Sequence, residues 1–210
     1  MKKLLIFVLC MSFILLAACG RNAPDGSISY VGPQYDTKIE NTAAKGELDG
    51  IKFGIGADID GVKSYFKKLA EDYNKEHQND NHEDHTFGDF DDDYAYYNVV
   101  DKGNYAVVET AAARYYYDKD NRTAGIVAIS SDSTVFGFTP GLTTKYEIEA
   151  EFKSEGKTVS AEKRDLELLA MPTASVLILR YTFEDYQLDF YFSDNMLIST
   201  AIVDTENWVY

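Results

Sequence analysis

Cysteine, proline, histidine and tryptophan are all scarce in this chain. Its 210 residues include two Cys, four Pro, three His and one Trp. With cysteine only at positions 10 and 19, no disulfide framework is available and packing has to hold the fold. The apolar run at 4–16 is too short to span a bilayer, which needs about 20 residues. Basic residues are also few, and the net charge of −15 argues against nucleic acid or an anionic membrane surface as a direct partner.

The residues that are present can build a core. Hydrophobic residues make up 45% of the chain and aromatic residues 14%, which excludes disorder throughout. The length allows one large domain or two small ones.

The N-terminus has the features of an export leader. Met1, Lys2 and Lys3 give a short positive start, and the apolar run at 4–16 fits a secretory h-region. The run ends in Leu16-Ala17-Ala18-Cys19, which resembles the bacterial lipobox. The resemblance implies that residues 1–18 are a lipoprotein signal peptide and that Cys19 is acylated, palmitate being one expected chain. An ordinary leader that happens to contain Cys is the alternative.

Cleavage after residue 18 would leave an extracytoplasmic protein held by lipid in the bacterial cell membrane. Whether that membrane is the inner or the outer one stays open. The mature chain would lose Cys10 and two lysines, so that 18 basic residues face 35 acidic ones and the net charge becomes −17. Residues 19–49 are predicted to be the lipidated Cys and a flexible tether, because Pro and Gly recur there without a sustained period. A helix that docks on the domain is the competing interpretation.

The remainder of the chain contains an internal similarity. Phe53-Gly54 matches Phe136-Gly137 at an offset of 83, and a helical pattern follows each copy. The first pattern has apolar residues on one face at 62, 65, 66, 69 and 73, and the second has Ile148 and Phe152. Further on, residues 114–118 align with 189–193 at an offset of 75.

These matches predict an α+β fold of two tandem repeats, 50–131 and 132–210, each a helix followed by an antiparallel four-stranded meander. We expect the strands of the first repeat near 94–101, 104–110, 112–118 and 125–131. In the second repeat we expect them near 165–171, 175–184, 186–193 and 197–204. The short link between the repeats favours a continuous or closely packed sheet.

A helix plus a four-stranded meander, given twice, resembles the β-lactamase-inhibitor-protein-like group. The resemblance rests on the Phe-Gly pairs at 53 and 136, the helix starts that follow them, and the closing hairpins 115–129 and 190–203. It implies non-catalytic contact with a protein, since members of that group have no shared catalytic residues. The disulfide that the inhibitor proteins use has no counterpart here, which argues against inhibition of β-lactamase itself.

Alternation along the strands identifies a candidate binding face. Tyr116 and Tyr191 are equivalent in the two repeats and fall on the face away from the helices, with Arg180 and Asp189 as polar neighbours. Tyrosine combines an apolar body with a polar tip and is frequent at protein interfaces. We therefore expect an aromatic sheet face that binds a protein partner or an envelope component. Packing of this face within the molecule is the alternative.

All three histidines lie within residues 77–85. His77, His82 and His85, with Asp84, could ligate Zn²⁺ or a similar ion, although their spacing matches no specific metal signature. A metal-binding lipoprotein that uses residues 77–93 is therefore the second hypothesis. A solvated acidic loop is the other explanation of this segment.

Catalytic motifs are missing from the chain. No Cys nucleophile survives cleavage, the histidines sit in one polar segment, and neither Gly-x-Ser-x-Gly, Ser-x-x-Lys nor a phosphate loop occurs. Carboxylates are plentiful, but nothing in the sequence places two of them across a cleft. We expect a binding module with no enzymatic activity and no cofactor.

Overall fold

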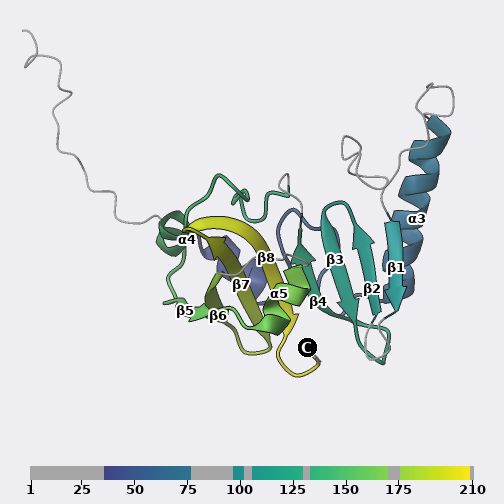
Figure 1. Cartoon of the computed structure of the whole chain (residues 1–210). Coiled ribbons are helices and arrows are strands. Elements are labelled where there is room, and N and C mark those ends of the chain that lie inside the picture. The colour runs from purple at the N-terminus through teal and green to yellow at the C-terminus, as the bar shows by residue number, and fades with distance from the viewer. Residues whose placement is uncertain (1–35, 77–96, 102–105, 130–132, 170–175, 209–210) are drawn as a thin grey trace, which may run out of the picture. The chain divides into compact units, whose positions relative to one another are not determined.

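An antiparallel sheet of eight strands organises the part of the chain that the structure describes (Figure 1). The structure is a computed structural model that describes residues 36–76, 97–101, 106–129, 133–169 and 176–208, all within the compact unit Tyr35–Tyr210. Helices and strands share this unit, which confirms the predicted α+β class.

The strand order is β1-β2-β3-β4-β8-β7-β6-β5, so two meanders meet at their last strands. Ile126 of β4 lies opposite Ile202 of β8, and this pairing makes the sheet continuous, as the short link favoured. The strands are β1 (Tyr97–Asp101), β2 (Ala106–Thr110), β3 (Ala113–Tyr117), β4 (Thr123–Ala128), β5 (Lys157–Ser160), β6 (Leu177–Thr182), β7 (Tyr186–Ser193) and β8 (Met196–Asp204).

Helices α3 (Ile59–Glu76) and α4 (Lys145–Glu151) form where the sequence predicted them. Asp58 precedes α3, and its carboxylate accepts a hydrogen bond from the backbone N–H of Gly61 at 3.1 Å. Thr144 and Glu147 form a capping box at the start of α4. These side chains satisfy N–H groups that the first turn of each helix would leave without partners.

The tether prediction is wrong for residues 36–49, which form helix α2 (Thr37–Ala43) and the loop after it. Ile39 and Ala43 of α2 are buried in the core, because they fall on one face of the helix. Glu40 accepts hydrogen bonds from the backbone N–H groups of Lys153 and Ser154, each at 2.9 Å. Burial raises the pKa of Glu40, but the bonds from Ser154 and Lys153 outweigh it and leave the pKa below its ordinary value. For residues 36–49 the competing interpretation is the correct one, because α2 is a helix that packs on the domain.

The two faces of the sheet carry separate apolar layers. Tyr115 and Tyr117 of β3 and Phe190 of β7 face the layer that contains α2, α3 and α4. Tyr116 and Tyr191 point to the opposite layer. This partition follows from the strict alternation of side chains along a strand and confirms the predicted orientation of both tyrosines.

The strand predicted at 165–171 is wrong, because residues 163–169 form helix α5 (Lys163–Leu169). The segment has no β-branched residue and is made of Lys, Arg, Asp, Leu and Glu, most of them good helix formers. Asp165, Leu168 and Leu169 are buried on one side of the helix, at spacings of three and four. The strand next to β6 is instead β5, which precedes α5.

Candidate functional site

Helix α5 covers the sheet face that the sequence analysis expected to be open. Leu168 and Leu169 pack in the same apolar layer as Tyr116 and Tyr191. The hydroxyl of Tyr116 and Nη1 of Arg114 both donate to the carbonyl oxygen of Leu168, at 3.1 and 3.2 Å. Strand β3 thus satisfies a carbonyl at the end of α5, where helical carbonyls have no partner within the helix.

The C-terminal segment covers a second part of this face. The ring of Trp208 meets that of Tyr116 edge to face, with centroids 5.5 Å apart. It lies against Gly125 of β4, where an added Cβ would come within 2.0 Å of Cζ3 of the indole. Gly125 therefore makes room for the only tryptophan of the chain.

Tyr116 and Tyr191 are core residues, and the expectation that they form an exposed binding face is wrong. Their exposed fractions are 5% and 2%. Burial is the main cause that raises the pKa of the Tyr191 hydroxyl far above its ordinary value. The alternative that this face packs within the molecule is the correct one, and α5 and Trp208 both contribute to its cover.

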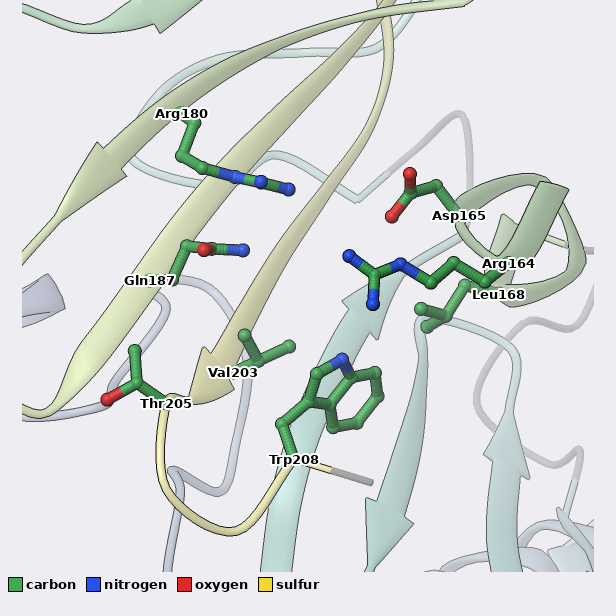
Figure 2. A pocket seen from close by; sticks show the side chains of 8 residues that line it. All are labelled: Arg164, Asp165, Leu168, Arg180, Gln187, Val203, Thr205 and Trp208. Atoms are coloured by element: carbon green, nitrogen blue, oxygen red, sulfur yellow. The ribbon is translucent and has the colours of Figure 1, made fainter. Parts of the chain in front are cut away.

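Beside α5 this face is hollowed by a half-open pocket of about 210 Å³. Figure 2 shows the side chains that line it, from α5 on one side and from the sheet and the C-terminal segment on the other. The lining residues are Arg164, Asp165, Leu168, Arg180, Gln187, Val203, Thr205 and Trp208. The pocket brings together residues up to 44 positions apart in the sequence, from Arg164 to Trp208.

Arg180 lines the pocket on the sheet side, and Asp189 holds it from behind. They are direct partners across β6 and β7, and Nε and Nη2 of Arg180 donate to the two carboxylate oxygens at 2.8 and 2.7 Å. Nε2 of Gln187 donates to the same carboxylate at 3.0 Å. The structure therefore brings together the two residues that the sequence named as polar neighbours, and it does so in the bidentate geometry that makes such pairs strong.

Burial sets the electrostatics of this pair. Asp189 is only 4% exposed, and burial raises its pKa, although the hydrogen bonds from Arg180 oppose the rise. Those same bonds raise the pKa of Arg180. Breaking such a pair by removing one partner would leave a charge that is largely shielded from water, which is costly.

Asp165 is the carboxylate that lines the pocket on the α5 side. It is 7% exposed, and its Oδ2 accepts a hydrogen bond from the backbone N–H of Glu162 at 2.7 Å. This bond fixes the side chain at the start of α5. In Figure 2 the Arg164, Arg180 and Gln187 side chains point toward the space between α5 and the sheet, and Asp165 lies at its edge. The pocket thus presents hydrogen-bond donors and a carboxylate acceptor.

The sequence analysis missed most of this site. Asp165 and Leu168 were assigned to a strand, and Arg164, Gln187 and Trp208 were not singled out. A usable signal was present, because the only tryptophan lies four residues beyond β8 and Gly125 lies inside strand β4. An isolated glycine in a strand often marks close approach by another group.

Several predicted sites lie outside the described residues. They are the lipidation site Cys19 and the metal candidates His77, His82, Asp84 and His85. Among the residues that the structure does describe, no three His, Cys, Asp or Glu side chains gather as a metal site would require. The metal hypothesis for 77–93 stays a prediction. No helix within the described ranges is long and apolar enough to cross a membrane.

Comparison with known proteins gave one similar solved structure to report. No family model matches the chain, and no curated protein is significantly similar to it. The crystal structure of a DUF4309 family protein (YjgB) from Bacillus subtilis subsp. subtilis str. 168 is similar at 13% identity, with a TM-score of 0.42. The match covers 80% of this chain and 93% of that protein. A likeness of this degree supports no conclusion about this chain.

Proposed function

We propose that this protein is an extracytoplasmic lipoprotein, anchored through Cys19, that works as a non-catalytic binding module. Its ligand site is the pocket between α5, the sheet and Trp208, in place of the aromatic face expected from the sequence. The observation that carries the binding role is the arrangement of polar groups around this half-open pocket of about 210 Å³.

The chemistry of the pocket favours binding over catalysis. Asp165 lines the pocket, whereas Asp189 is turned into its pair with Arg180 and does not line it. Among the described lining residues there is therefore one carboxylate and no Cys, His or Ser. A pair of carboxylates across the site, or a nucleophile with its base, is the usual requirement for hydrolysis.

The anchor is supported by the leader. A positive start, an apolar run and the Leu-Ala-Ala-Cys ending occur in the order and at the distances that export and acylation require. Replacing Cys19 by Ala should abolish incorporation of labelled palmitate and release the protein from the membrane fraction. Retention of the label in that variant would refute the assignment of Cys19.

We also propose that the two halves of the sheet are diverged tandem copies of the kind that the sequence resemblance implies. One support is the position of the strand irregularities, which lie between Tyr116 and Tyr117 of β3 and between Tyr191 and Phe192 of β7, at the predicted offset of 75. The second support lies at the helix starts. Asp58, before α3, forms an isolated antiparallel β-bridge with Arg122, just before β4. Thr144, before α4, forms the equivalent β-bridge with Met196, the first residue of β8.

The binding role can be tested by cross-linking in the cell envelope. The lipidated wild type is compared with Arg164→Gln, which alters the pocket, and with Lys163→Gln, which removes the same charge from the same turn. The side chain of Lys163 is 91% exposed, and Lys163 does not line the pocket. We expect capture of a component by the wild type and Lys163→Gln, and weaker capture by Arg164→Gln. Equal capture by all three proteins would show that the captured component does not bind in the pocket.

A further inference from the structure

We infer that the pocket beside α5 takes an uncharged, hydroxyl-rich ring, of the size of one saccharide unit. This inference rests on the proposed binding function and adds the chemical class of the ligand. It is carried by three properties of the pocket: its balance of charge, its mixture of donors and acceptors, and its size and walls.

Each arginine of the pocket has a carboxylate partner. Nε of Arg164 lies 3.6 Å from Oε2 of Glu162, and Arg180 is paired with Asp189, while Asp165 adds a further carboxylate to the lining. An anionic ligand would meet an Arg180 whose charge Asp189 already compensates, and it would lie against Asp165. A cation would have to share Asp165 with the two guanidinium groups that line the same space, and it would lose its hydration on entering. A neutral ligand meets neither repulsion, and it loses no hydration of a charge on entering.

Donors and acceptors are both available to such a ligand. Arg180 uses its Nε–H and one N–H of Nη2 for Asp189, so its remaining guanidinium N–H groups are the donors that it can offer to a ligand. The hydrogen bond of Asp165 among the described residues goes to Oδ2, so Oδ1 is its acceptor for a ligand. Gln187 offers a carbonyl oxygen while its amide donates to Asp189. Hydroxyl groups, which both donate and accept, match this set of partners.

The size and walls of the pocket fit a ring. A volume of 210 Å³ equals that of about seven water molecules in the liquid and lies below the roughly 300–1,000 Å³ of pockets for drug-sized molecules. Leu168, Val203 and the indole of Trp208 provide apolar surface beside the polar groups. A saccharide unit has the same two kinds of surface, C–H groups and hydroxyls.

The single tryptophan makes the test specific. Trp208 is the only Trp of the chain and it lines the pocket, so indole emission reports on this site alone. The full mature protein is titrated with glucose, N-acetylglucosamine and the tetramer of N-acetylglucosamine. Sodium acetate, inorganic phosphate, ethanolamine and L-alanine serve as charged and zwitterionic probes. Saturation-transfer NMR on the same probes provides a second readout that does not depend on emission.

We expect at least one saccharide to change the emission and to receive saturation, with an affinity that varies less than twofold between low and high salt, because a neutral ligand is not screened. Binding of the tetramer alone would indicate a polymeric glycan, whereas binding of a monosaccharide would indicate a free sugar, and either supports the class. Asp165→Asn should lower the association constant about tenfold or more, because a hydrogen bond to a charged group is lost. Lys163→Gln should leave it unchanged.

The remaining outcomes separate the inference from the proposed function. Preferential binding of a charged or zwitterionic probe would overturn the saccharide class and leave the pocket as the site. Envelope capture that depends on Arg164, with no saccharide bound in either readout, would also overturn the class while the binding function stands. Equal saccharide affinity of wild type and Asp165→Asn would overturn the assignment of the Asp165 carboxylate as an acceptor for the ligand.

Discussion

The contact between Gly125 and Trp208 can be tested by a double-mutant cycle. Gly125→Ala adds one methyl group at the point where the indole lies on β4. The added Cβ would be 2.0 Å from Cζ3 of Trp208 and 2.7 Å from Cε3 and Cη2. Ordinary carbon contacts are about 3.5–4.0 Å, so the ring would have to move by more than 1 Å. That movement would separate Trp208 from Tyr116 and open the pocket.

The expected magnitude follows from two opposing effects. Overpacking of this kind costs about 1–3 kcal/mol of the free energy of unfolding. In a Trp208→Ala background the clash is gone, and Gly125→Ala should instead stabilise by about 0.4–1 kcal/mol, because Ala restricts the unfolded chain. The two backgrounds should therefore differ by roughly 1.5–4 kcal/mol, a coupling far above the scatter of about 0.5 kcal/mol seen for independent sites.

The assay is urea unfolding of four proteins, each carrying Cys19→Ala so that no lipid is attached. Circular dichroism follows the transition, because two of the four proteins lack tryptophan. Destabilisation by Gly125→Ala in the presence of Trp208, and none in its absence, is the expected pattern. If the effects of the two substitutions simply add, the indole does not lie on Gly125 and the described wall of the pocket is wrong.

Three further outcomes are expected. Tyr116→Phe should cost about 1 kcal/mol in the same unfolding assay, because the hydroxyl loses its hydrogen bond to Leu168; an unchanged midpoint would mean that this bond contributes nothing to holding α5. Gly156→Ala should destabilise by about 1–3 kcal/mol, since its Cβ would lie 2.6 Å from a core methyl group. Gly61→Ala lies in a helix, and its Cβ would make only an ordinary contact of 3.8 Å with Oδ2 of Asp58, so it should stabilise by about 0.5–1 kcal/mol; the reverse order would contradict the packing. Glu40→Gln should destabilise at neutral pH, because the pKa of Glu40 is lowered in the fold, so its contribution is present above the ordinary value of 4.5 and is lost as the pH falls through the folded pKa. Stability curves against pH for the two proteins that stay parallel down to pH 3 would contradict this.

Local patterns in the sequence were enough to predict much of the sheet. The strands β1 to β4 and β6 to β8 lie within a few residues of the expected ranges, because alternation and turn residues are encoded over short distances. The β3–β4 turn is an ordinary hairpin turn, with Asn121 at positive φ and the Asp118 carboxylate accepting from the backbone of Asp120 and Arg122. The same alternation assigned Tyr115 and Tyr117 to one face and Tyr116 to the other.

Helices α2 and α5 show where local pattern fails. Each has only seven residues, and each is stabilised by contacts far away in the sequence. Glu40 of α2 bonds the loop after α4, and the end of α5 bonds Arg114 and Tyr116 of β3. A tether and a strand were reasonable predictions from composition, and tertiary contacts overrode both.

The sequence by itself determined the α+β class, the alternation of the strands and the neighbourhood of Arg180 and Asp189, because each depends on residues close together or on a repeated spacing. Only the tertiary structure decided whether the sheet face that carries Tyr116 and Tyr191 is exposed or covered. Whether an apolar face stays exposed depends on what packs on it, and here a helix between β5 and β6 and a tryptophan beyond β8 cover the tyrosines. The pocket exists because that cover is incomplete beside Arg180, and such a gap follows from how distant segments pack, which no local pattern records.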